Sequence, residues 1–193
     1  MGQIDFKKTI EGLKSTGYNP IPSAVKVSIP DARSILTRGL RYYNNDAFWL
    51  PEYDEVVDWL SDNKGKGLLC YGNCGRGKSL ICWNIIPLLL NHYHNLIVSC
   101  YSAIQMNQNI NKVIDQHVLC LDDIGTEGMS SVWGEKRMVF SEIVDQAEKK
   151  GKLLIITTNL SYEEIAAKYG ERTMDRLIAI TRRVKFVGES LRR

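Results

Sequence analysis

Residues 72–79 read Gly72-Asn73-Cys74-Gly75-Arg76-Gly77-Lys78-Ser79. This stretch matches the phosphate-binding pattern G-x-x-x-x-G-K-[ST] at every fixed position. The apolar run 67–71 before it predicts a short buried strand, and the apolar run 79–86 after it predicts a helix. Because strand, loop and helix stand in the order that the pattern requires, we prefer a phosphate-binding loop to an ordinary glycine-rich turn.

The residue types in this loop predict its chemistry. Glycines at 72, 75 and 77 allow backbone conformations in which successive N–H groups converge on phosphate oxygens, next to a helix N-terminus. All eight residues, 72–79, are therefore candidates for binding ATP. Lys78 is predicted to reach the β- and γ-phosphates, and the Ser79 hydroxyl to ligate Mg²⁺.

Composition indicates a globular protein with one main domain. The 193 residues are 44% hydrophobic and 24% charged, with a net charge of +3. Neither a membrane-spanning apolar run nor the apolar core of a signal peptide is found in the sequence, so we expect a cytoplasmic protein that binds no membrane. The five cysteines show no C-x-x-C spacing and lie mostly in apolar runs, which favours core residues over disulfides or zinc ligands.

The first part of the chain predicts a helical lead-in. Residues 1–50 are interpreted as an N-terminal extension and linker, and 51–193 as an ATPase domain. The linker contains three prolines, Pro20, Pro22 and Pro30. Asp31 is predicted to cap a helix that runs to about Tyr42, and Pro51 to open a second helix.

Four further runs predict the rest of a mostly parallel α/β sheet of five strands, flanked by helices: 96–101, 118–121, 153–158 and 184–187. Polar residues follow two of these strands. Asp122 is predicted to hold Mg²⁺ through water, Asp123 to polarise the attacking water, and Asn159 to contact the γ-phosphate or that water. An acidic turn without a catalytic role is the simpler alternative for the two aspartates.

Helices are predicted between these strands. The pattern indicates a helix over 135–150 and another over 162–169, which opens with the capping box Ser161 and Glu164. Arg172 and Arg176 lie four residues apart on one face of the next helix. His92 and His94 have no acidic or cysteine neighbour in the sequence, so we interpret them as solvated.

The last dozen residues are basic. Arg182, Arg183, Lys185, Arg192 and Arg193 face only one acidic residue there, Glu189. This basic tail predicts either a solvated strand or weak, sequence-independent binding to single-stranded DNA.

Taken together, GNCGRGKS, LCLDDIGTE, IITTNLSYEEI and YGERTMDRL resemble the AAA+ ATPases of the DnaC/DnaI helicase-loader family, and are also similar to IstB-type transposition helper ATPases. The resemblance covers residues 50–193. It implies an AAA+ core without a C-terminal lid domain, in which Gly77, Lys78 and Ser79 match Walker A and the two aspartates Walker B. Asn159 then matches sensor 1, and Arg172 and Arg176 match the basic pair that contains an arginine finger.

The resemblance also implies partners and an activity. We expect a Mg-dependent ATPase that forms a homo-oligomer with ATP and uses it to switch its assembly with a replicative helicase and single-stranded DNA. One arginine of the pair is expected to reach a neighbouring subunit's γ-phosphate, and the other to pair with Glu171 or Asp175. The segment 102–117 is shorter than in family members, with room for one short helix.

Other functions remain open. A transposition helper ATPase would use the same motifs, and a non-hydrolysing scaffold would fit the aspartate at 123, where many AAA+ proteins have glutamate. A small-molecule kinase would need lid arginines, which the sequence does not offer. A GTPase would need Asn-Lys-x-Asp, and residues 158–161 read Thr-Asn-Leu-Ser instead.

Overall fold

The computed structural model describes residues 4–18, 23–128, 130–132 and 135–191. Its main sheet contains β1 (Gly67–Gly72), β2 (Ser99–Ser102), β3 (Val118–Ile124), β6 (Leu153–Thr158) and β7 (Thr181–Phe186). The strand order is β2-β3-β6-β1-β7, and every neighbouring pair is parallel. The predicted α/β fold with a five-stranded parallel sheet is therefore confirmed. Pro20 and Pro22 of the predicted linker, and Arg192 and Arg193 of the basic tail, lie outside the described residues.

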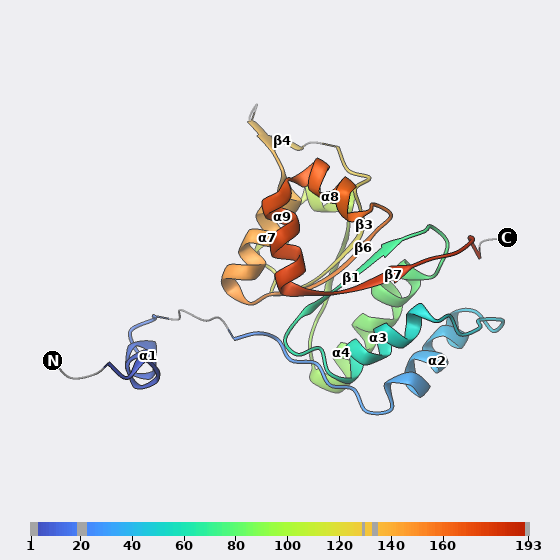
Figure 1. Ribbon diagram of the computed structural model, residues 1–193, viewed down its shortest axis with the longest axis horizontal. Coiled ribbons are helices and arrows are strands. Elements are labelled where there is room, and N and C mark those ends of the chain that lie inside the picture. Colours follow the sequence, from blue (N-terminus) through green and yellow to red (C-terminus); the bar gives the residue numbers. More distant parts are fainter. Residues whose placement is uncertain (1–3, 19–22, 129, 133–134, 192–193) are drawn as a thin grey trace.

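Helices cover both faces of the sheet (Figure 1). One face is covered by α2 (Ala32–Tyr43), α3 (Glu52–Ser61), the π-helix η1 (Leu80–Ile85) and α4 (Ile86–His94); the other by α5 (Ala103–Gln108), α6 (Ile110–Asp115), α7 (Val139–Lys150), α8 (Tyr162–Tyr169) and α9 (Glu171–Ile180). Side chains alternate between the two faces along each strand. Leu68 and Cys70 thus enter one core cluster, and Leu69 enters the other.

The N-terminal part divides into two regions. Helix α1 (Phe6–Lys14) buries none of its residues and lies away from the sheet (Figure 1). From Val27 onward the chain packs in the same core as α3 and β1, through Ile29, Leu36 and Leu40. The division at residue 50 stays a prediction, because the shared core by itself does not define a domain boundary.

Asp31 does not cap α2 as the sequence predicts. The helix begins at Ala32, directly after it, but the Asp31 side chain accepts no hydrogen bond from the helix. Its backbone adopts a left-handed conformation with φ of 48°. An N-cap residue normally has extended dihedrals, which aim its side chain at the first free N–H groups.

The helix after the phosphate loop forms where it is predicted, but with π geometry over Leu80–Ile85. The N–H of Ile86 donates to Ile81 O, five residues back. Pro87 follows at the start of α4 and has no N–H for the regular ladder. The wider turn lies directly before this interruption, as is common for π-bulges in helices.

Other bounds differ from the prediction as well, including the fifth strand, which covers Thr181–Phe186 rather than 184–187. The second strand begins at Ser99 rather than at residue 96, because Ser99 pairs with Leu119 and β3 starts only at Val118. The segment 102–117 holds two short helices, α5 and α6, rather than one, since Asn109 ends the first and begins the second. The predicted helix 135–150 begins only at Val139.

The residues before Val139 form a hairpin. Strand β4 (Ser130–Val132) pairs antiparallel with β5 (Glu135–Arg137), apart from the main sheet. The sequence predicts helix here instead, because a three-residue strand is too short to show a period that distinguishes it from helix. The helix ends at Lys150, as predicted, and Gly151 follows it with φ of 63°, the left-handed conformation that commonly closes a helix.

Candidate active site

The predicted phosphate loop connects β1 to η1, and its glycines are used as the motif requires. Gly72, Gly75 and Gly77 have φ of 109°, 73° and 89°, which only glycine adopts without strain. A Cβ at Gly72 would lie 2.4 Å from Phe186 O, so the loop also passes close to β7. The Asn73 N–H donates to the same carbonyl over 2.9 Å. The neighbouring edge strand therefore holds the loop in place.

Lys78 lies at the centre of the site, with 6% of its surface exposed. Its ammonium group donates to Gly72 O over 2.8 Å and to Asn73 O over 2.7 Å. A third bond of 2.8 Å goes to Asn159 Oδ1 at the end of β6. Burial lowers the pKa of Lys78, because desolvation disfavours its charged form. The predicted loop lysine and the predicted sensor amide are thus in direct contact.

An irregularity in β3 makes the side chains of Asp122 and Asp123 point in different directions. The pairing of β3 with β6 shifts register between Leu121 and Ile124, and Asp123 has φ of 59°. Such a shift redirects side chains at functional edges of sheets. The Asp123 carboxylate accepts from Asn159 Nδ2 over 2.9 Å, so Lys78, Asn159 and Asp123 form one hydrogen-bonded chain.

Asp122 is fixed by a residue that the sequence analysis did not identify. Thr157 Oγ donates to Asp122 Oδ1 over 2.6 Å and accepts from the Asp123 N–H over 2.8 Å. Thr157 is buried, with 1% of its surface exposed. The signal available in the sequence was a hydroxyl residue at the end of an otherwise apolar strand.

A cavity of about 770 Å³ lies against these residues. The phosphate loop contributes Cys74, Gly75, Gly77, Lys78 and Ser79, and the strand ends contribute Asp122, Asp123, Thr157 and Asn159. A third part of the lining comes from the end of α2 and the following turn, including Phe48. The volume is within the range of ligand pockets, and hydroxyl and carboxylate oxygens of the type Mg²⁺ prefers face it. Its donor and acceptor set fits a magnesium nucleotide.

The side chain of Arg76 does not face this cavity. It donates twice to Glu52 Oε1, over 3.0 and 2.8 Å, and both side chains are about 90% buried, at 10% and 7% exposure. Glu52 opens α3, whose next residue, Tyr53, donates from its hydroxyl to Arg76 O over 3.2 Å. Burial, and next the Glu52 charge, raise the pKa of Tyr53 to about 12. The predicted nucleotide contact of Arg76 can therefore involve only its backbone.

A segment that the sequence analysis did not connect with the site crosses the loop. Leu191 N donates to Gly75 O over 3.0 Å, and Asn73 Nδ2 donates to Gly188 O over 2.8 Å. A Cβ at Gly75 would lie 2.1 Å from Ser190 Oγ, and Leu191 lines the cavity. The Asn73 side chain, predicted to contact nucleotide, thus holds the segment 188–191 against the loop.

Arg172 and Arg176 lie on α9, outside the cavity lining. Arg176 bridges to α7, where it forms ion pairs with Asp145 and, over 2.8 Å, with Glu148. The expected pairing with Glu171 or Asp175 on the same helix is therefore wrong, because the carboxylates that Arg176 contacts are on α7. The Arg172 side chain is exposed and makes no hydrogen bond or ion pair with the described residues.

The histidines and cysteines do not add a metal site. His94 is not simply solvated, because its Nε2 lies 3.1 Å from both the backbone nitrogen and the carbonyl oxygen of Ser28. All five cysteines are free thiols. Across the described part of the chain, no cluster of three or more histidine, cysteine or acidic residues could hold a metal ion, and no helix is long and apolar enough to cross a membrane.

Comparison with known proteins identifies the fold. No protein-family model and no curated protein sequence matches this chain. Among solved structures, the DnaC helicase loader aligns with a TM-score of 0.55 and 18% identity over 83% of this chain and 93% of that one. DnaI aligns with a TM-score of 0.54 and 20% identity over 84% of this chain and 85% of that one. AMPPCP-bound DnaA from Aquifex aeolicus aligns with a TM-score of 0.51 and 15% identity over 72% of this chain and 49% of that one.

These likenesses confirm the expected α/β fold, a five-stranded parallel sheet flanked by helices, and the solved structures include DnaI and the DnaC helicase loader. At 15–20% identity they establish the fold alone. The functional argument therefore depends on the site itself.

Proposed function

We propose that this protein binds Mg-ATP and hydrolyses it slowly. The observation that carries the proposal is the hydrogen-bonded chain from Lys78 through Asn159 to Asp123, in one cavity with the phosphate loop. Lys78 would contact the β- and γ-phosphates, Asp123 would polarise the attacking water, and Asn159 would align the two. Ser79 and Asp122 would hold Mg²⁺, which supplies charge neutralisation on the phosphate oxygens.

We further propose that a neighbouring subunit completes the site with Arg172. The two arginines of α9 differ in one respect that selects between them. Arg176 forms ion pairs with two carboxylates of α7, whereas Arg172 is exposed and forms no ion pair with the described residues, although its charge helps to lower the pKa of Asp145. A planar, permanently charged guanidinium suits phosphate oxygens whose charge changes during transfer. ATP would then favour a homo-oligomer, because it lies between two chains.

The partner that we propose is a replicative helicase, by the fold shared with the DnaC helicase loader. When the purified chain is mixed with the replicative helicase of the same organism, a complex should elute in size-exclusion chromatography with Mg-ATP present. The complex formed by Lys78→Ala should no longer depend on ATP, since this lysine is proposed to contact the phosphates. If no complex forms in any nucleotide state, the helicase is not the partner. The second candidate function, a transposition helper ATPase, would then be favoured.

Single-stranded DNA is proposed to bind along β7, at the edge of the sheet. Arg183 and Lys185 are exposed there, and the Arg183 guanidinium lies 5.5 Å from the ring centroid of Tyr162. Tyr162 in turn stacks on Tyr71 with centroids 4.4 Å apart. Basic residues beside aromatic rings are the usual surface for a single strand. Arg182 points to the other face, where it donates to Asp62 O over 3.2 Å.

We expect Arg183→Ala with Lys185→Ala to weaken binding of a fluorescent oligothymidine about tenfold at low salt, and to reduce the salt slope by roughly 0.7 per residue. Arg182→Ala should weaken binding less, since that side chain already contacts the protein. Fluorescence anisotropy over a salt series measures both quantities. Equal losses for the two variants would place DNA elsewhere on the chain.

A further inference from the structure

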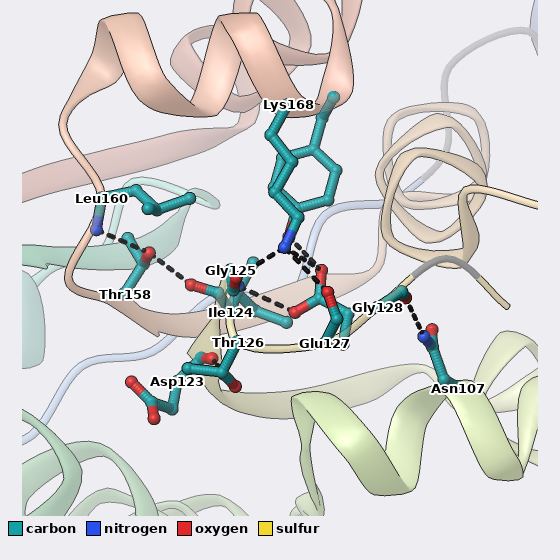
Figure 2. Close-up of polar contacts among 11 residues, drawn as sticks. Asn107, Asp123, Ile124, Gly125, Thr126, Glu127, Gly128, Thr158, Leu160 and Lys168 are labelled. Carbon is teal, nitrogen blue, oxygen red and sulfur yellow. Dashed lines mark hydrogen bonds and ion pairs between the residues drawn. The ribbon is translucent and has the colours of Figure 1, made fainter.

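The residues directly after Asp123 form a turn that is held from several sides (Figure 2). Thr126 Oγ donates to Asp123 O over 2.9 Å, and Thr158 Oγ donates to Ile124 O over 2.5 Å. On the side of α5, Asn107 Nδ2 donates to Gly128 O over 2.7 Å. The turn is thus hydrogen-bonded within itself, to β6 and to α5, independently of α8.

Glu127 adds a buried charge to this turn. Its carboxylate accepts from the Gly125 N–H over 2.8 Å and from the Tyr169 hydroxyl, and only 7% of the residue is exposed. Lys168 Nζ lies 3.7 Å from the same carboxylate. Burial, and next the bond to Glu127, raise the pKa of Tyr169, so its hydroxyl stays a donor. A buried carboxylate requires such partners, and apart from the Gly125 N–H they come from α8.

Lys168 strengthens the same connection through the backbone. Its ammonium donates to Gly125 O over 2.5 Å and to Glu127 O over 2.8 Å (Figure 2). Lys168 and Tyr169 are the last two residues of α8. We call Glu127, Lys168 and Tyr169 the turn clamp, because together they attach the turn after Asp123 to the end of this helix.

The turn clamp lies next to the start of α9. Gly170, with φ of 89°, is the only residue between α8 and α9. Tyr169 O accepts from Thr173 Oγ over 2.9 Å, so the clamp residue also holds the first turn of α9. Arg172 is in that turn. A set of hydrogen bonds thus joins the turn after Asp123 to the first turn of α9, which contains the arginine proposed for the next active site.

The simpler interpretation is that these bonds only stabilise the fold. Removing one partner of a buried charge is generally destabilising, whatever the function. However, the anchors of Thr126, Thr158 and Asn107 do not involve α8. The clamp bonds are the ones that connect the turn with the α8–α9 junction.

We propose that the turn clamp positions Arg172 for the neighbouring active site, which makes Glu127, Lys168 and Tyr169 positioning residues for catalysis in trans. This inference rests on the proposed function. It predicts that a mutation in the turn clamp lowers ATP turnover strongly when the mutated chain supplies Arg172. The same mutation should lower turnover little when the mutated chain supplies the nucleotide site.

Mixed assemblies separate these two roles. In the reference mixture, Lys78→Ala chains donate Arg172 and Arg172→Ala chains provide the nucleotide site. Tyr169→Phe removes only the clamp hydroxyl and keeps the ring, which packs on Phe140. Added to the donor chain, it should lower turnover about tenfold, because Arg172 would be positioned less accurately at the neighbouring site. Added to the Arg172→Ala chain instead, it should change turnover less than about twofold.

A matched control is Tyr101→Phe in the donor chain, because Tyr101 is a half-buried tyrosine packed against the same core cluster. It should leave the reference turnover unchanged. A readout besides activity is amide hydrogen exchange, which should become faster in residues 171–176 of Tyr169→Phe and stay unchanged in residues 118–121 of β3.

The outcomes are distinct. The reference mixture can be active while Tyr169→Phe lowers turnover equally in both chains, or does not lower it in the chain that supplies Arg172. Either result overturns the proposed role of the turn clamp and leaves the proposal of a site shared between two chains intact. Unchanged exchange in residues 171–176 also overturns it. An inactive reference mixture overturns the trans site and the role of the clamp with it.

Discussion

Replacing Arg172 with alanine should lower ATP turnover by roughly 10³–10⁵-fold, the range measured for arginine fingers, while ATP binding remains. The reason is that the guanidinium would stabilise charge in the transition state and contribute little to ground-state binding. Single-turnover hydrolysis at saturating protein, with ATP affinity measured separately, gives the two quantities.

Arg176→Ala is the matched control on the same helix face. Because Arg176 pairs with Asp145 and Glu148, its loss should lower the melting temperature. It should not cause the large loss of turnover expected for Arg172→Ala. Arg172→Ala, which removes an exposed side chain, should leave the melting temperature nearly unchanged. The reverse pattern would make Arg176 the finger and Arg172 a surface residue.

The second large effect separates binding from catalysis at the nucleotide site. Lys78→Ala should abolish tight ATP binding, because it removes the buried cation that we propose contacts the phosphates. Asp123→Asn should keep binding and lower turnover by about 10²–10⁴-fold, the usual contribution of a general base. Equilibrium binding of a fluorescent ATP analogue and single-turnover hydrolysis distinguish the two variants.

Lys112→Ala, an exposed lysine of α6, is the control for charge removal and should change neither measurement. If Asp123→Asn hydrolyses ATP at the unmutated rate, Asp123 does not polarise water. If the unmutated chain binds ATP but does not hydrolyse it in any assembly state, the chain is a nucleotide-dependent scaffold.

The parts of the site that could be predicted from the sequence are those fixed by local chain geometry. A G-x-x-x-x-G-K-[ST] run imposes its own backbone, and residues that follow parallel strands meet at one edge of the sheet. These two rules bring Lys78, Asp123 and Asn159 to one edge of the sheet from the sequence alone. The capping box of Ser161 and Glu164 is also local, and the structure confirms it.

The rest depends on contacts between distant segments. The Arg76–Glu52 pair and the bond from Leu191 to Gly75 join residues 24 and 116 positions apart, and no sequence period indicates such pairs. Thr157 was missed because its role depends on the irregular register of β3. The turn clamp of Glu127, Lys168 and Tyr169 cannot be predicted, because charged residues are mostly exposed and nothing in the sequence indicates that Glu127 is buried.

The central claim is that two chains together make one ATPase site, and the mixture of Lys78→Ala with Arg172→Ala chains tests it most directly. Each variant alone is predicted to hydrolyse ATP at a background rate, since one lacks the phosphate contact and the other lacks the arginine. Mixed under assembly conditions, they should recover turnover wherever an intact nucleotide site meets an intact Arg172. A mixture no more active than its two components, while the unmutated chain hydrolyses ATP, would show that each chain works alone and would contradict the account.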